Sequence, residues 1–549
     1  MEPKPDLEPR TDLEPKTDLE PRTDLEPKTD LLIIARNIFD GIASEAREGY
    51  IRINRKRIRE IGWGKPEEPV IKSAKTVFTF DKELVMPGIT DTHTFFTGYA
   101  IYHLGLDVSK ISTKKEAIRD FSGYAKRKEI GQPIFGHGWN PKQWDRLEAE
   151  EVAEELFKER PVVLFSADRS TCIMNSIAKE RYQFTPEECY PEAYYRIMKE
   201  YLTDEVFIGQ EFKAYMKMMN ARGVTTVKEM GFDDFYGFTD YLEKMDHSEQ
   251  LTLRIFFMSQ PVGQEMNLDY ARKMKDIFTG DKVRFSGFNC MTDGTIANYR
   301  GDLLKPYEGK HFCCGMDIDY SQIEQDVLLA DAKGFRFSLH AQGDGAVHKV
   351  VEIYDKCKKV HGKLINRHTI TDLEFTHPAD LKKMGEIGVT AELYFQIMSL
   401  DSGEAVKNNI ESTIGEERGK YYWNRRTMAE EGITLSGATD LPLLLTSVPE
   451  SIYYSCGGYF PEGGEAFQKE NTITVPELLK AWTIGGQRNL GMEDKLGTLE
   501  AGKLADIAVF DKNLLDIPLS EARAAKVIMT LSDGKIVYQE ENNKTGFTK

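Results

Sequence analysis

Basic residues are short in this sequence relative to acidic ones, and long apolar runs are absent. Its 549 residues include 72 Lys and Arg against 89 Asp and Glu, a formal net charge of −17. A surface of this sign repels phosphates at long range, so nucleic acid is not an expected partner. No segment approaches the ~20 apolar residues that cross a bilayer. The N-terminus has no apolar run behind a basic start, so we expect neither a membrane partner nor a secretory signal.

Cysteine and histidine are also scarce. The 7 Cys have no regular spacing, so they do not predict a disulfide framework, and a reducing cytoplasm fits best. There are only 10 His, and each one placed near a carboxylate is a candidate for chemistry. Hydrophobic residues, by contrast, make up 40% of the chain. This is ample material for the core of a globular protein.

Residues 1–30 are dominated by a tandem repeat of Thr-Asp-Leu-Glu-Pro-Lys/Arg. Pro in every unit prevents a continuous helix, and one Leu per unit cannot form a core. We therefore expect a disordered tail over 1–30, with regular structure beginning near Leu31.

The rest of the chain shows two kinds of pattern. Short strand-like runs lie near both ends, at 32–35, 50–53, 76–80, 504–510 and 535–538. They predict a small composite β domain built from 31–86 and 491–543. Between the ends, strand-like runs alternate with helical patterns, as at 161–166, 223–227, 335–340 and 432–437. This alternation predicts an α/β fold with a parallel sheet over 87–490, and we expect a helical insert at about 105–220 above its mouth.

Two motifs carry a family resemblance. The segment Met86-Pro87-Gly88-Ile89-Thr90-Asp91-Thr92-His93 resembles the strand-one motif of the amidohydrolase superfamily, and residues 497–510 resemble its C-terminal signature. Interior pieces are similar to amidohydrolase family 3, the branch of YtcJ-like and N-substituted formamide deformylase-like proteins. These pieces are Gly138-Trp139, Asn175-Ser176, 223–227, Asp293-Gly294, 340–344, Asp440-Leu441-Pro442 and 482–484. The resemblance covers residues ~31 to 540. It implies a (β/α)8 TIM-like barrel with a small flanking β-sandwich domain.

The family's metal centre uses His-x-His on strand one, a carboxylated Lys on a middle strand, one His from each of the next two strands, and a final Asp. Carried over by position, the resemblance keeps His93, His340 and Asp440. The other three positions hold Phe95, Asn289 and Asp372. Without the bridging Lys, two metals are not expected. The resemblance implies one divalent ion, Zn, Mn or Fe, held by His93, His340, Asp372 and Asp440.

The resemblance also suggests roles for individual residues. Asp440 is expected to be the general base and His340 to stabilise the oxyanion. The alternative for Asp440 is a helix cap, and the alternative for Asp372 is an exposed loop position.

Three further residues are predicted to bind substrate: His137, Trp139 and Glu229. The alternative for His137 and Trp139 is a packed loop. The alternative for Glu229 is an ion pair at the barrel rim, beside Lys228.

These expectations lead to a metal-dependent hydrolase whose activated water attacks a carbonyl carbon of a small, open or cyclic, substrate. The resemblance implies an amide C–N bond. One alternative is a cyclohydrolase that opens a cyclic 1,3-dicarbonyl by C–C hydrolysis. The other is a catalytically inactive binding protein with an eroded metal site. The partner is expected to be a small molecule, and the resemblance also allows a homodimer.

Overall fold

The computed structural model describes residues 29–128, 131–167, 171–186, 189, 196–231, 233, 238–261, 265–541 and 546–548. Most of the tail predicted over 1–30 lies outside the described residues. Thr29 and Asp30 already belong to strand β1 (Thr29–Ile38), so regular structure begins slightly earlier than the sequence indicated.

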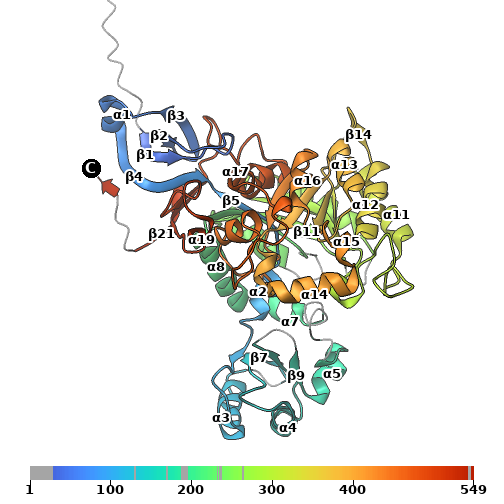
Figure 1. Ribbon diagram of the computed structural model, residues 1–549. Helices are drawn as coiled ribbons and strands as arrows, with labels where there is room; N and C mark the ends of the chain where they lie inside the picture. The colour runs from blue at the N-terminus through green and yellow to red at the C-terminus, as the bar shows by residue number, and fades with distance from the viewer. Residues whose placement is uncertain are drawn as a thin grey trace, which may run out of the picture.

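Eight parallel strands form a nearly closed barrel at the centre of the molecule (Figure 1). In order around the barrel they are β5 (Ile89–Thr94), β10 (Val224–Glu229), β11 (Arg254–Ser259), β12 (Val283–Met291), β13 (Phe337–Ala341), β16 (Thr369–Asp372), β17 (Thr390–Tyr394) and β18 (Thr434–Ala438). The first and last strands meet where the Thr92 hydroxyl donates to the Gly437 carbonyl at 3.0 Å. The predicted TIM-like fold class is confirmed.

Helices cover the outside of the barrel. They include α8 (Glu205–Ala221), α9 (Phe238–His247), α10 (Leu268–Ile277), α11 (Tyr320–Ala332), α12 (Asp344–Asp355), α13 (Pro378–Ile387), α16 (Arg425–Glu430), α17 (Val475–Lys480) and α18 (Gly486–Leu490). Polar caps start several of them: the Asp204 carboxylate accepts the amides of Val206 and Phe207 at the start of α8. Every residue of β11 is buried, because a parallel sheet covered on both faces leaves no solvent side.

The two ends of the chain pair in one further sheet. Its order is β21 (Lys535–Gln539), β20 (Val527–Ser532), β19 (Ile507–Phe510), β4 (Ala74–Pro87), β1, β2 (Arg47–Asn54) and β3 (Arg57–Trp63), with β22 (Gly546–Thr548) also paired to β4. Apolar residues from both halves, such as Ile33, Ile51 and Leu531, share one hydrophobic cluster. The sheet is therefore folded over its own core. A short helix, α1 (Glu68–Ser73), precedes β4.

A buried ion cluster joins this domain to the barrel. The Arg254 guanidinium on β11 makes two 2.9 Å bonds to Asp506 and also contacts Asp533, and all three side chains are buried. This junction has no local sequence signal, because its partners are more than 250 positions apart.

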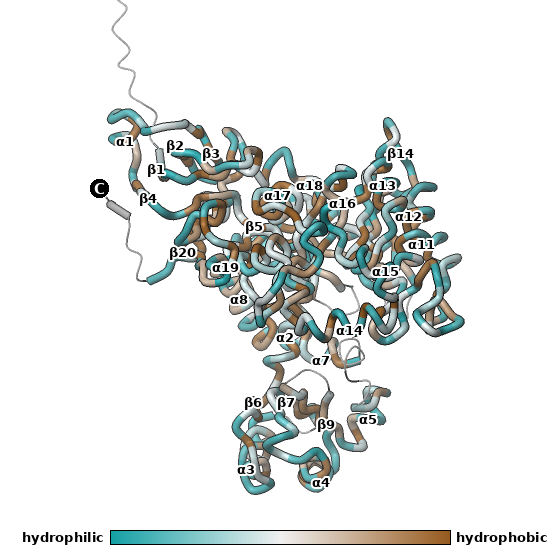
Figure 2. Tube along the Cα trace, viewed as in Figure 1, coloured by the Kyte–Doolittle hydropathy of each residue, from teal (hydrophilic) through white to brown (hydrophobic). Residues whose placement is uncertain are grey.

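The segment 105–220 differs from the predicted helical insert. It contains a four-stranded sheet in the order β6 (Leu106–Asp107), β7 (Ile134–Trp139), β8 (Val162–Ser166) and β9 (Cys172–Met174), together with α3 (Lys114–Ala125), α4 (Arg146–Leu156) and α5 (Ser176–Tyr182). The run at 161–166, predicted as part of the central sheet, belongs here instead. The insert forms a lobe beside α2 (Phe96–Ile101) and α7 (Met198–Leu202), and hydrophilic residues colour much of α3 on its outside (Figures 1 and 2).

The cysteines and the helices bear on the disulfide and membrane classes. None of the seven cysteines is in a disulfide bond in the structure. Among the residues that the structure describes, no helix has both the length and the apolar character of a membrane span.

Candidate active site

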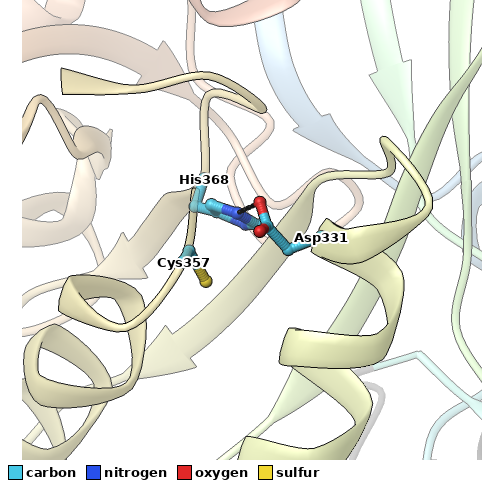
Figure 3. A group of neighbouring side chains, drawn as sticks. All are labelled: Asp331, Cys357 and His368. Carbon is cyan, nitrogen blue, oxygen red and sulfur yellow. Dashed lines mark hydrogen bonds and ion pairs between the residues drawn. The ribbon is translucent and has the colours of Figure 1, made fainter. Parts of the chain in front are cut away.

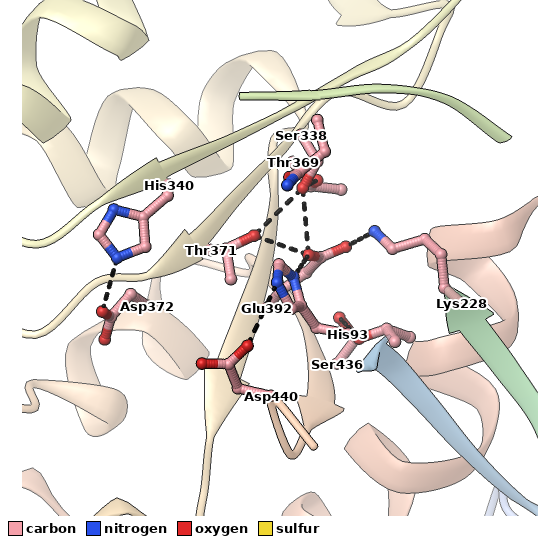
Figure 4. A network of polar contacts seen from close by, with 12 residues as sticks. His93, Lys228, Ser338, His340, Thr369, Thr371, Asp372, Glu392, Ser436 and Asp440 are labelled. Atoms are coloured by element: carbon pink, nitrogen blue, oxygen red, sulfur yellow. Dashed lines mark hydrogen bonds and ion pairs between the residues drawn. The ribbon is translucent and has the colours of Figure 1, made fainter. Parts of the chain in front are cut away.

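The carboxyl ends of the barrel strands bring the four predicted ligands to one mouth (Figure 4). His93 lies on β5, His340 on β13 and Asp372 at the end of β16, and Asp440 follows β18. Because all barrel strands are parallel, their carboxyl ends meet at the same face, which is where such barrels place their chemistry. The structure therefore brings together residues up to 347 positions apart in the sequence.

These four side chains form two neighbouring His–Asp pairs. His93 Nε2 lies 3.6 Å from Asp440 Oδ1, and His340 Nε2 lies 3.0 Å from Asp372 Oδ2. Within the described ranges, no three of these ligand atoms lie within 4.8 Å of one another. The site is thus open rather than a closed cage of four ligands.

A buried carboxylate supports His93 from behind. Glu392 on β17 places Oε2 3.5 Å from His93 Nδ1, which leaves Nε2 facing Asp440. The carboxylate also contacts the Lys228 ammonium on β10 and accepts hydrogen bonds from Thr371 at 2.7 Å and Asn489 at 2.8 Å. A carboxylate behind a histidine fixes the tautomer and the ring orientation, an arrangement common behind metal-binding imidazoles.

Electrostatics keep Glu392 ionised although it is fully buried. Burial alone raises its pKa, but Lys228 and then His93 hold the pKa of Glu392 well below its usual range. Glu392 was not predicted from the sequence, and Lys228 was considered only beside Glu229 at the barrel rim. The available signal was a charged residue in the apolar strand Thr-Ala-Glu-Leu-Tyr, because ionisable side chains are rarely buried without a partner.

The second pair, His340 and Asp372, lies close to several other polar and acidic side chains. The Asp372 carboxylate also accepts from the Gln342 amide at 2.6 Å, and Asp293 Oδ1 lies 3.9 Å from His340 Nδ1. Burial lowers the pKa of His340, but the bond to Asp372 and the charges of Asp372, Asp293 and Asp440 outweigh it and raise this pKa to about 9. His340 is therefore an imidazolium at neutral pH, in a position that favours positive charge.

The local backbone conformation orients the side chains of Asp372 and Asp440. Asp372 and Asp440 have φ values of 82° and 48°, in the left-handed region that Asp tolerates better than most residues. Asp91, fully buried in the strand-one motif, holds the segment before Asp440: it accepts the Thr439 hydroxyl at 2.6 Å and the Thr439 amide at 3.1 Å. Loss of hydration raises the pKa of Asp440 to about 6, although His93 opposes this shift.

Two of the three changed family positions, Phe95 and Asn289, do not supply ligands. The Phe95 ring packs edge-on against His93, with ring centroids 5.5 Å apart. Asn289 is buried, and its amide donates to Gln260 at 3.1 Å.

Two of the predicted substrate-binding residues, Glu229 and Trp139, are buried in packing contacts. Glu229 is fully buried, where it accepts the Phe96 amide at 2.7 Å and the Tyr215 hydroxyl. It does not face the mouth, and the alternative of a rim ion pair is also wrong, because Lys228 pairs with Glu392 inside the barrel. Trp139 is buried in the core of the insert and donates its indole N–H to the Trp144 carbonyl at 3.0 Å.

The third, His137, is partly exposed. It contacts the Leu104 carbonyl at 3.3 Å. Its role toward substrate stays a prediction.

The donor set at the mouth fits a divalent metal ion. His93 presents Nε2 beside the Asp440 carboxylate with Glu392 behind it, and the carboxylates around His340 favour a cation there. Imidazole nitrogen with carboxylate oxygen suits Zn, Mn or Fe. By contrast, the buried group Asp331, Cys357 and His368 does not fit a metal (Figure 3). Both ring nitrogens of His368 are used: Nε2 lies 3.0 Å from Asp331, and Nδ1 accepts the Phe337 amide at 3.0 Å.

Comparison with known proteins gives a consistent match over most of the chain. Residues 82–538 match the sequence profile of the amidohydrolase family. The protein LONG AFTER FAR-RED 3 of Arabidopsis thaliana is 21% identical over 92% of this chain and 91% of its own length. The putative amidohydrolase YtcJ of Bacillus subtilis is 20% identical over 88% of this chain and 93% of its own length.

Among solved structures, the fold is similar to that of an uncharacterized metal-dependent hydrolase from Pyrococcus furiosus. The two superpose with a TM-score of 0.69 at 18% identity, over 88% of this chain and all of the other. At this level of sequence identity, the similarity is evidence for the fold alone.

Proposed function

Because this chain belongs to the amidohydrolase family, and is thus a hydrolase, we propose that its barrel mouth hydrolyses an amide C–N bond of a small molecule with one divalent metal ion. The observation that carries the proposal is the arrangement of His93 between Glu392 and Asp440. A histidine oriented in this way by a buried carboxylate offers one ring nitrogen to the mouth, next to a second carboxylate.

His93 and Asp440 would hold the ion, with His340 and Asp372 beside them. When bound, such an ion polarises a carbonyl and lowers the pKa of water near it. His340 Nε2 and Asp372 Oδ2 bond to each other here, so His340 would offer Nε2 only when that bond opens, whereas the second oxygen of Asp372 needs no such change. The imidazolium of His340 is suited to stabilise the negative oxygen that develops on the attacked carbonyl.

Asp440 is the proposed general base. It takes a proton from the attacking water and passes it to the leaving nitrogen, so that the C–N bond breaks to a carboxylic acid and an amine. Burial raises its pKa to about 6, which is close to the working range of a base at neutral pH. Asp91 and Thr439 fix the backbone from which its side chain extends.

Metal content and turnover test the proposal together. We expect the protein, purified without chelators and supplied with Zn, Mn or Fe, to hold about one equivalent of metal. A His93→Ala, Asp440→Ala double variant should lose it. His348→Ala is the matched control, because this histidine lies on α12 and pairs with Asp380 at 2.8 Å outside the mouth. Below roughly a tenth of an equivalent in the wild type, the metal-dependent proposal fails.

The scissile bond is tested separately. A panel of small linear and cyclic amides, run beside cyclic 1,3-dicarbonyls, distinguishes C–N from C–C hydrolysis. Turnover of the dicarbonyls alone would replace the amide proposal by the ring-opening alternative. Metal binding with turnover of neither class would favour the catalytically inactive binding protein.

A further inference from the structure

A buried arginine lies beside the candidate active site. Arg425 is the first residue of α16 and is 5% exposed. It lines a small cavity with Asp372, Tyr394 and Trp423, and on its other side a second small cavity with Tyr454, Gln468 and Asn471. The first of these lies toward the candidate active site. The Tyr394 ring packs edge-on against His93, with centroids 5.9 Å apart. The cavity therefore adjoins both His–Asp pairs of the mouth.

The guanidinium of Arg425 lacks an anionic partner. Among the residues that the structure describes, none offers it a carboxylate within 4.0 Å or a side-chain hydrogen bond, and its closest recorded contact is the Trp423 ring, 5.7 Å from Cζ. The adjacent Arg426 shows what a structural arginine looks like on the same helix. Its guanidinium makes two bonds to Glu477, at 3.0 and 2.9 Å, and one to the Thr472 carbonyl at 3.1 Å.

An unpaired buried charge is costly, and arginine cannot relieve the cost by losing its proton. Burial lowers the pKa of Arg425 to about 10, which still leaves the side chain charged at neutral pH. Contact with an aromatic face compensates only part of the lost hydration. A charge kept in this state next to a reaction site is explained most simply by a ligand that brings the opposite charge.

We propose that Arg425 binds the carboxylate of the substrate, which is then a small amide that carries a carboxylate group. The planar guanidinium matches a carboxylate with two parallel hydrogen bonds. The remaining lining is largely apolar, with Leu393 and Ile397, so it strengthens this attraction. Asp372, the acid in the lining, is already bonded to His340 and Gln342.

The size of the cavity favours a compact anion. Its volume is about 10 Å³, close to the space of a single water molecule. A carboxylate entering this space needs less adjustment of the lining than a phosphate or a sulfonate. The amide part of the assignment rests on the proposed function, whereas the binding of a carboxylate at Arg425 does not.

Thermal unfolding and calorimetric titration of the full chain test this site without turnover. The probes are sodium acetate against sodium chloride at equal ionic strength, and N-acetylglycine against its methylamide. In the wild type we expect acetate and N-acetylglycine to raise Tm, and N-acetylglycine to bind about tenfold more tightly than the methylamide. In Arg425→Met the preference should vanish, and in Arg425→Lys it should persist in part.

The Tm of the variants without added anions is a second measurement, and here the substitution at Arg425 should stabilise the protein. Arg425→Met should raise Tm in the absence of anions, because it removes a buried charge that has no partner. The control Arg426→Met should lower Tm and leave the acetate response unchanged, because that side chain is bonded to Glu477. Equal acetate responses in wild type and Arg425→Met, a lower Tm in Arg425→Met, or a stronger response to phosphate than to acetate would each overturn the assignment. If metal and turnover fail while the carboxylate preference holds, only the proposed reaction is lost.

Discussion

Replacement of Lys228 by Met should expose how much the barrel depends on its internal ion pair. Lys228 and Glu392 contact each other across the barrel, and both side chains are 0% exposed. Removal of one partner leaves the other as an uncompensated buried charge, which costs about 3–5 kcal/mol. The remaining donors to Glu392, from Thr371 and Asn489, soften this loss without replacing the cation.

The expected shift in Tm follows from the size of the chain. Globular proteins gain about 2.1 cal/mol/K of entropy per residue on unfolding, or about 1 kcal/mol/K for a chain of this length. A loss of about 3–5 kcal/mol therefore lowers Tm by about 3–5 °C. Calorimetry or circular dichroism measures this directly, and metal titration of the same samples reports on His93, whose Nδ1 faces Glu392.

The chain offers a matched control with the same residue types at the surface. Lys244 and Glu205 lie 2.7 Å apart, but their side chains are 63% and 68% exposed. Lys244→Met should change stability by less than about 0.5 kcal/mol. If Lys228→Met and Lys244→Met shift Tm equally, the argument from burial is wrong. A Lys228→Met, Glu392→Leu double variant should regain part of the stability but not the metal affinity, since His93 then has no carboxylate behind it.

Three further substitutions and one control provide additional tests. Gly437→Ala on β18 should cost about 1–3 kcal/mol in urea unfolding, because the new methyl group overlaps the buried Trp482 ring; Gly123→Ala, on α3 with open space around it, should be neutral or stabilising by up to about 1 kcal/mol. Arg254→Met should lower stability by several kcal/mol, on the order of 3–5, and should loosen the end sheet in proteolysis. Arg254 holds the pKa of Asp533 below its ordinary value against the opposing effect of burial, so this contribution is full above about pH 4 and is lost as pH falls further; Arg254→Met should abolish that part of the acid dependence. Glu392→Gln should weaken metal binding about 10–100-fold in equilibrium dialysis with circular dichroism unchanged, and unaltered affinity would contradict the supporting role of this carboxylate.

Local patterns in the sequence predicted an α/β fold with a parallel sheet, and the family resemblance supplied the eight-stranded barrel and the positions of four candidate site residues. Strand-like runs with a polar residue at their carboxyl end predict a mouth, because parallel strands all end at one face. His93, His340, Asp372 and Asp440 follow this rule, and the structure places each at that end of its strand. The prediction of a substrate contact failed for Glu229, because successive side chains of a strand point to opposite faces of the sheet. Glu229 ends its strand as expected, yet its carboxylate points into the packing around Tyr215.

The network behind the site had only one local signal, the charged residue Glu392 within an apolar strand. Its partner Lys228 is 164 positions away, so the sequence does not indicate that the two side chains pair. Trp139 likewise matches a family motif, but its surroundings come from the separate core of the insert. Arg425 and Arg426 are neighbours of the same type. Only packing makes one of them buried and unpaired and the other a partner of Glu477.

The sequence by itself therefore determined the fold class, the family and the residue types available for chemistry, because periodicity, motif order and composition are properties of the chain read in one dimension. The tertiary structure decided which charges meet. Ion pairing, burial and the direction of a side chain depend on residues brought together across the barrel, and their energies depend on the exclusion of water. For this reason the two His–Asp pairs, the carboxylate behind His93 and the unpaired charge of Arg425 became visible only in three dimensions.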